Sequence, residues 1–248
     1  MAALCRFAPR TWASRLQQRT FHSYENTRPL QSSSTVEDAI LSAAYRHVPK
    51  HGFSHRSLNQ GARDAGYLDI SSSVLSDGVF SLIRFHLVRQ RLSLAQKCQT
   101  MFETNDKNIS NGATGTKIAD IIWARLLANK NVIHKWQDAL AVMAQPSYVT
   151  LSMKELALLS DEIWYLAGDK SVDFSWYPKR ASLSIVYSTS ELFMTNDKSP
   201  GFVDTHNFMS RRLDEATTMG GLIGSISTWT NFTAYASVNV LRSKGAKL

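Results

Sequence analysis

Cysteine is scarce in this chain, and its scarcity excludes several kinds of site. Among 248 residues only Cys5 and Cys98 occur. Cys5 lies in an N-terminal segment that we expect to be removed, as argued below, so the mature protein would keep only Cys98. Neither an intrachain disulfide nor a thiol-rich zinc site could then form. Such sparing use of cysteine agrees with a reducing compartment.

The sequence also lacks the short motifs that mark common catalytic centres. It contains no HExxH, GxSxG or GxGxxG pattern. Glu191 stands without a second catalytic group, so we interpret it as a hydrogen-bonded structural carboxylate rather than a general base. We therefore predict a protein that is not an enzyme and needs no cofactor.

Three histidines recur every four residues, at His47, His51 and His55. On one unbroken helix they would form a metal-binding face. Pro49 and Gly52 interrupt any such helix. We therefore interpret the three as solvated turn histidines and predict no metal site.

Acidic residues are absent from the first 24 positions, although the chain carries a net charge of +8. The segment has apolar residues at helical spacing and four arginines, which is the composition of a mitochondrial presequence. An exposed basic arm is the alternative. We predict a presequence at residues 1–21, followed by a polar tether at residues 22–34. The four arginines are Arg6, Arg10, Arg15 and Arg19.

Apolar residues recur with the period of helices after residue 34, and no segment keeps the two-residue period of a strand. We therefore predict an all-α fold. A capping box from Ser34 to Glu37 opens a first helix that Pro49 ends. Thr104 to Thr116 is expected to be a loop. The later helices are expected to start near Ser54, Ser71 and Val79 and to span Lys117–Ala128, Val132–Ala144, Ser152–Ala167, Ser175–Thr195, Gly201–Ala216 and Met219–Leu241.

Three short helices before a long fourth form the layout of a helix-turn-helix head on a helical body. Residues 40–86 resemble the TetR-type regulators at Ala44, Gly52-Phe53, Ala62, Ala65-Gly66 and the entry to the fourth helix. This resemblance predicts a head at residues 35–78 and a ligand-binding and dimerisation body at residues 79–216. A TetR-type DNA-binding regulator with an apolar pocket is the alternative function that follows from it.

DNA binding is disfavoured by the charges around the expected third helix. The window from Asp64 to Ile83 contains Asp64, Asp69 and Asp77 and no lysine or arginine. A recognition helix with this charge would be repelled by phosphates. We therefore expect no nucleic-acid partner.

The C-terminal segment, residues 217–248, has an apolar stripe followed by basic residues. Ten of the 26 residues from Ala216 to Leu241 are serine, threonine or asparagine, so a transmembrane span is disfavoured. The pattern predicts an amphipathic helix that lies on a membrane surface, and the alternative is a helix docked on its own body. The predicted membrane-contacting residues are Leu222, Ile226, Trp229 and Phe232.

Residues 158–212 carry the most specific signal. The strings WYLAGD, DFSWYPKRA, YSTSELFM, DKSPGFVDT and FMSRR follow one another here, and the run resembles the Coq-nine family of ubiquinone-biosynthesis proteins. The resemblance extends, more weakly, from about Thr35 to Ala216. Pro178 departs from it, since members commonly have threonine there, and the tail is poorer in charge than in some relatives.

The resemblance implies a mitochondrial, peripheral membrane protein on the matrix side of the inner membrane. It implies a homodimer that binds isoprenoid quinone intermediates or other long-chain lipids without catalysing a reaction. It also implies that the protein presents them to the demethoxyubiquinone hydroxylase within the ubiquinone-biosynthesis complex. Carried over by motif, the partner-binding residues are Asp161, Ile163, Trp164, Trp176, Tyr177 and Arg180.

The body also has more apolar residues than one amphipathic face per helix requires. Some of them could line a lipid cavity between helices, and a fully packed core is the alternative. We expect lipid contacts from Leu159, Leu166, Leu183, Val186, Tyr187 and Met194.

Overall fold

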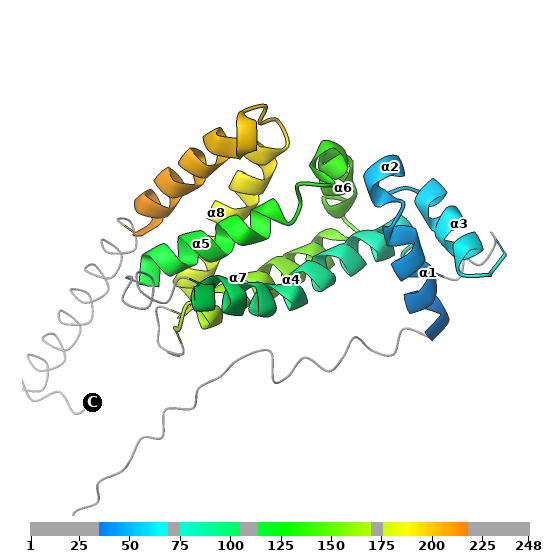
Figure 1. The fold of residues 1–248 in the computed structure, drawn as a ribbon, viewed down its shortest axis with the longest axis horizontal. Helices are drawn as coiled ribbons and strands as arrows, with labels where there is room; N and C mark the ends of the chain where they lie inside the picture. Colours follow the sequence, from blue (N-terminus) through cyan, green and yellow to red (C-terminus); the bar gives the residue numbers. More distant parts are fainter. Residues whose placement is uncertain (1–34, 69–74, 105–113, 170–175, 218–248) are drawn as a thin grey trace, which may run out of the picture.

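The computed structural model describes residues 35–68, 75–104, 114–169 and 176–217. Within these residues the structure is helical and contains no strand, which confirms the predicted all-α fold (Figure 1). The expected presequence, tether, Ser71 helix and C-terminal helix fall outside the described residues, as does Ser34 of the expected capping box.

The head contains α1 (Thr35–Tyr45), α2 (Val48–His51) and α3 (His55–Asp64). Ser54 caps α3 as expected, because its side-chain oxygen accepts a hydrogen bond from the backbone N–H of Ser57 at 3.4 Å. After α3, Gly66 adopts a positive φ of 82°, which glycine reaches without strain. These helices stand at the start of the long α4, which is consistent with a TetR-like layout.

Pro49 does not end the first helix, so that prediction was wrong. α1 ends at Tyr45, and Pro49 lies in the first turn of the separate helix α2. Proline is tolerated there because the first turn of a helix leaves its N–H groups without intrahelical acceptors.

The helix α4 (Val79–Thr104) connects two hydrophobic clusters. Its first half packs on the head and on α6 (Trp136–Met143), around Trp136. Its second half packs on α5 (Thr114–Leu127), α7 (Val149–Leu166) and α8 (Trp176–Met194). Figure 1 shows the head at one end of α4 and the other helices along its length.

Three further boundaries differ from the prediction. α5 begins at Thr114, inside the expected loop. The expected helix over Val132–Ala144 is a 3₁₀ turn, η3 (Ile133–Lys135), followed by α6. The last described helix covers residues 203–217 after the short turn η4 (Pro200–Phe202), in which both Gly201 and Phe202 have positive φ.

Candidate functional site

The end of α7 and the start of α8 place three aromatic and two basic side chains on one surface. Tyr177 is the most exposed of them, at 75%, whereas Trp176 and Trp164 are partly buried. The rings of Trp176 and Tyr177 meet edge to face, with centroids 4.7 Å apart. We call this region the aromatic-basic surface; it consists of Trp164, Trp176, Tyr177, Lys179 and Arg180.

Arg180 holds Trp176 in place. Its guanidinium carbon lies 4.0 Å from the centre of the Trp176 ring, within range of a cation–π interaction. Its Nε donates a hydrogen bond to Oδ1 of Asp161 at 2.6 Å, and both side chains are buried. An ion pair with so little access to water is rigid, so it fixes the plane against which Trp176 lies.

Lys179 pairs with an aspartate and lies over a tryptophan ring, as Arg180 does. Its Nζ donates to Asp169 at 2.9 Å and lies 5.4 Å from the centre of the Trp164 ring. The indole N–H of Trp164 donates to the backbone carbonyl of Lys179 at 3.2 Å. Each tryptophan of the surface is therefore in contact with one cation that an aspartate of α7 or of its C-terminal end holds.

The structure brings together five of the six expected partner-binding residues, although Asp161 lies beneath the surface. Ile163 is fully buried in the body cluster and offers no surface in this chain. Lys179 and Asp169 were missed by the prediction. Their signal was their place inside the DFSWYPKRA and WYLAGD strings.

The expected lipid-contacting residues lie between α7 and α8. Leu159, Leu183, Tyr187 and Met194 belong to the body cluster, and Leu166 packs against it. Val186 is buried on the same helix. All six therefore face the interior of the body, on the same two helices that carry the aromatic-basic surface.

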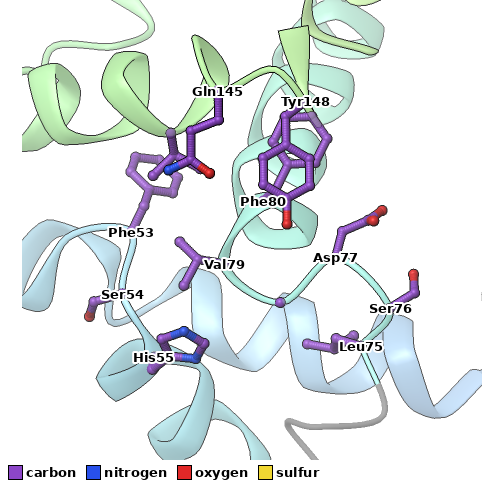
Figure 2. A pocket seen from close by; sticks show the side chains of 12 residues that line it. Phe53, Ser54, His55, Leu75, Ser76, Asp77, Val79, Phe80, Gln145 and Tyr148 are labelled. Carbon is purple, nitrogen blue, oxygen red and sulfur yellow. The ribbon is translucent and has the colours of Figure 1, made fainter. Parts of the chain in front are cut away.

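A pocket of about 620 Å³ opens elsewhere, between the head, the start of α4 and the α6–α7 connection. Figure 2 shows Phe53, His55 and Asp77 around it, together with the stacked rings of Phe80 and Tyr148, whose centroids are 4.4 Å apart. None of the six expected lipid-contacting residues lines this pocket.

Glu191 is a buried structural carboxylate in a network that crosses the protein. Its Oε1 accepts hydrogen bonds from Nδ2 of Asn129 at 2.7 Å and from the hydroxyl of Tyr187 at 2.8 Å. Burial raises the pKa of Glu191, and the charge of the buried Arg125 opposes that shift. Nη1 of Arg125 donates to Oδ1 of Asn129 at 2.9 Å.

The network continues through His86 to the head. Burial, and then the charge of Arg125, lower the pKa of His86 to about 3, so its ring is neutral. Nε2 of His86 must donate to Oδ1 of Asn129, 2.9 Å away, because that oxygen only accepts. Nδ1 therefore accepts the hydroxyl proton of Tyr45 at 2.9 Å, and Gln90 donates to the Tyr45 oxygen at 3.2 Å. The direction of these bonds makes Glu191 the final acceptor.

One of the three histidines of the head contacts a carboxylate. Nε2 of His47 lies 2.6 Å from Oδ2 of Asp64. Across the described parts of the chain no group of three or more potential metal ligands exists.

One face of α8 carries apolar side chains in contact with solvent. Ile185 is 64% exposed and Leu192 is 53% exposed, seven residues further along the helix. Phe193 stacks on Phe208 of the 203–217 helix, with ring centroids 4.6 Å apart. The two helices therefore present a partly apolar outer face.

The four expected membrane-contacting residues lie beyond residue 217 and so outside the described structure. Among the helices that are described, none is both long enough and apolar enough to span a bilayer.

Comparison with known proteins gives the same family throughout. The COQ9 family model matches residues 149–220, which include α7, α8 and the aromatic-basic surface. The chain is 35% identical over 238 residues to "Ubiquinone biosynthesis protein coq9, mitochondrial" of Schizosaccharomyces pombe, covering 95% of this chain and 91% of that protein. It is 32% identical over 209 residues to the COQ9-A protein of Xenopus laevis, covering 82% of this chain and 65% of that protein.

The human COQ9 protein is 31% identical to this chain over 205 residues, covering 79% of this chain and 62% of the human chain. It too is named a mitochondrial ubiquinone biosynthesis protein. Identity at this level over nearly the whole fission yeast protein shows common descent. The chain belongs to the COQ9 family.

Proposed function

We propose that this chain acts in ubiquinone biosynthesis as a lipid-binding accessory protein without catalytic activity of its own. It binds an isoprenoid quinone intermediate and presents it to the demethoxyubiquinone hydroxylase at the matrix face of the mitochondrial inner membrane. The names of its relatives support the pathway and the organelle. The structural observation that supports the proposal is that one helix, α8, begins at the aromatic-basic surface and has an apolar inner face.

The docking surface is the aromatic-basic surface. Tryptophan, tyrosine and arginine are the residues most enriched at the hot spots of protein interfaces, and the two aromatic side chains bury large areas. Tyr177 is largely exposed, and Asp161 and Arg180 hold Trp176 beside it. The indole nitrogen of Trp176 has no hydrogen-bond partner among the described residues, so it is a donor that a partner can use after a small shift.

The lipid site lies between α7 and α8. The expected lipid-contacting side chains already pack together there, so an isoprenoid chain enters by replacing contacts between the two helices with contacts to itself. This exchange costs little apolar burial. Because α8 begins at the docking surface, its displacement on lipid loading also moves Trp176 and Tyr177.

The outer face of α8 and the 203–217 helix form the dimer contact. An isologous contact pairs the same patch on both copies, and Ile185 and Leu192 supply exposed apolar area at its centre. Ile185→Arg should convert the dimer to a monomer in analytical ultracentrifugation at unchanged helicity. A variant that stays dimeric contradicts this assignment.

The lipid proposal is tested by mass spectrometry of organic extracts from protein purified without added lipid. We expect an isoprenoid quinone or a similar long-chain lipid at close to one molecule per chain. A folded protein whose extract contains no such lipid would overturn lipid binding.

The docking proposal is tested with Trp176→Lys, which places a second cation beside Arg180. We expect loss of binding to the hydroxylase in a pull-down assay, with helicity and bound lipid unchanged. Met153→Lys, which places the same cation at a 58% exposed position near the start of α7, is the matched control. Retained hydroxylase binding by the Trp176 variant would remove the start of α8 from the interface.

A further inference from the structure

Two of the stretches that contain no carboxylate lie around α2, α3 and the turn η3. One runs from residue 39 to residue 63 and the other from residue 121 to residue 137. Together they carry six lysines and arginines outside the buried Arg125, and four histidines. They include α2, the turn η3 and all of α3 except its last residue, Asp64. Both stretches of the sequence are therefore positively charged.

The fold places these two stretches beside each other. Nε2 of His134 donates a hydrogen bond to the backbone carbonyl of Pro49 at 3.0 Å. A Cβ atom built on Gly52 would lie 3.4 Å from Cβ of Lys135. Figure 1 shows α2 close to α6, which follows η3 directly. We call the result the basic surface; it consists of Lys50, His51, Arg56, Lys130, His134 and Lys135.

The lysines and the arginine of the basic surface form no ion pair within the described residues, although Asp138 follows Lys135 by three positions. Lys50, Arg56 and Lys130 are exposed. Asp64, the carboxylate of α3, already pairs with His47 at 2.6 Å. Desolvation, and then the charges of Arg56 and Lys50, lower the pKa of His51, as expected where cations crowd together.

We propose that the basic surface docks on anionic phospholipid headgroups, as a membrane contact separate from the C-terminal segment. A phosphate-bearing bilayer attracts spread cations without requiring a shaped pocket, and each basic residue near it adds to the attraction. A protein interface would need an aromatic or apolar anchor, and the exposed large apolar residues of the described structure include none from α2 or η3. Duplex DNA is disfavoured by Asp64 and Asp77, which bound the region that would approach a groove.

Vesicle flotation of the full chain tests this proposal. Phosphatidylcholine vesicles with and without phosphatidylglycerol are compared for the wild type, for Lys50→Glu/Arg56→Glu/Lys130→Glu, and for the matched control Lys117→Glu/Lys154→Glu/Lys198→Glu. Both triple variants change the net charge equally and keep the C-terminal segment. Glutamate at position 56 lies in the first turn of α3, where a negative charge suits the helix dipole.

We expect the wild type and the control to bind the anionic vesicles more tightly than the neutral ones, and the basic-surface variant to lose about a hundredfold of that affinity. Added salt should remove the same difference.

An equal loss in both triple variants would show that only net charge matters and would overturn the proposal. So would unchanged binding by the basic-surface variant, or retention on duplex DNA that depends on these residues without any effect on vesicles. The outcome is independent of lipid extraction and hydroxylase docking, which have their own readouts.

Discussion

Asn129 donates a hydrogen bond from Nδ2 to Oε1 of Glu191 at 2.7 Å, although 62 residues separate the two along the chain. The same asparagine accepts from Arg125 and from His86 through Oδ1. One side chain thus satisfies groups on α4, α5 and α8. It lies where the head cluster and the body cluster meet, so it links the two halves of the molecule.

Asn129→Ala should lower the free energy of unfolding by about 3 kcal/mol, because it leaves the buried Arg125 and His86 donors without their acceptor. Urea denaturation followed by circular dichroism measures this loss. Asn131→Ala is the matched control, since Asn131 is exposed in the same turn and should cost less than 0.5 kcal/mol in the range typical of surface substitutions. Equal losses in the two variants would contradict the role of the network.

His86 predicts how stability depends on pH. Its pKa is about 3 in the folded protein and about 6.5 in an unfolded chain. Between these values the unfolded state binds a proton that the folded state does not, so His86 reduces stability as pH falls, by up to about 1.4 kcal/mol per pH unit. His86→Gln should remove this contribution and flatten the pH profile of the unfolding free energy between pH 4 and 6, a window inside those limits. Profiles that run parallel for wild type and variant would show that His86 is not buried in its neutral form.

The sequence predicted the helices better than their contacts. The spacing of apolar residues located α4, α7 and α8 to within about three residues, because helical periodicity is a local property. Pro49 was misread because proline both ends helices and begins them. The local pattern does not distinguish the two cases.

The aromatic-basic surface was predicted from motif strings, but its construction was not. Trp176, Tyr177 and Arg180 lie within five consecutive residues, whereas Asp161 joins them only because α7 packs against α8. Glu191 was predicted to be a hydrogen-bonded structural carboxylate, but the network that joins it to His86 and Tyr45 was not predicted, because its members are far apart in the sequence.

Gly61 shows a contact that sequence reasoning passed over. A Cβ atom at this position would lie 2.4 Å from Cα of Ala44, so α1 and α3 approach too closely for any side chain. Gly61→Ala should force the helices apart and lower the free energy of unfolding by about 2 kcal/mol. Gly115→Ala is the opposite control: nothing lies within 4 Å of its Cβ position in α5, so the alanine should raise stability by about 0.5 kcal/mol through its helix propensity. Thermal unfolding of the two variants should therefore shift in opposite directions.

Substitutions of Asp161 and Tyr177 distinguish the effect of the aromatic-basic surface on stability from its effect on hydroxylase binding. Asp161→Asn removes the carboxylate that pairs with the buried Arg180, so the guanidinium is left without its counter-charge and the free energy of unfolding should fall by about 3 kcal/mol. Tyr177→Ala removes a ring that is 75% exposed, so stability should change by less than about 0.5 kcal/mol.

If the proposed docking surface is correct, both variants bind the hydroxylase more weakly, but for different reasons. Asp161→Asn releases Arg180 from its position over Trp176, so binding should recover in part when the folded protein is stabilised by a ligand or by low temperature. Tyr177→Ala removes interface area itself, with a loss of about 2 kcal/mol expected for a hot-spot tyrosine, and no stabilising condition should restore it. Isothermal titration of the hydroxylase at two temperatures distinguishes these cases. A Tyr177 variant that binds like the wild type would show that the exposed ring is not part of the interface, even if Asp161→Asn is impaired.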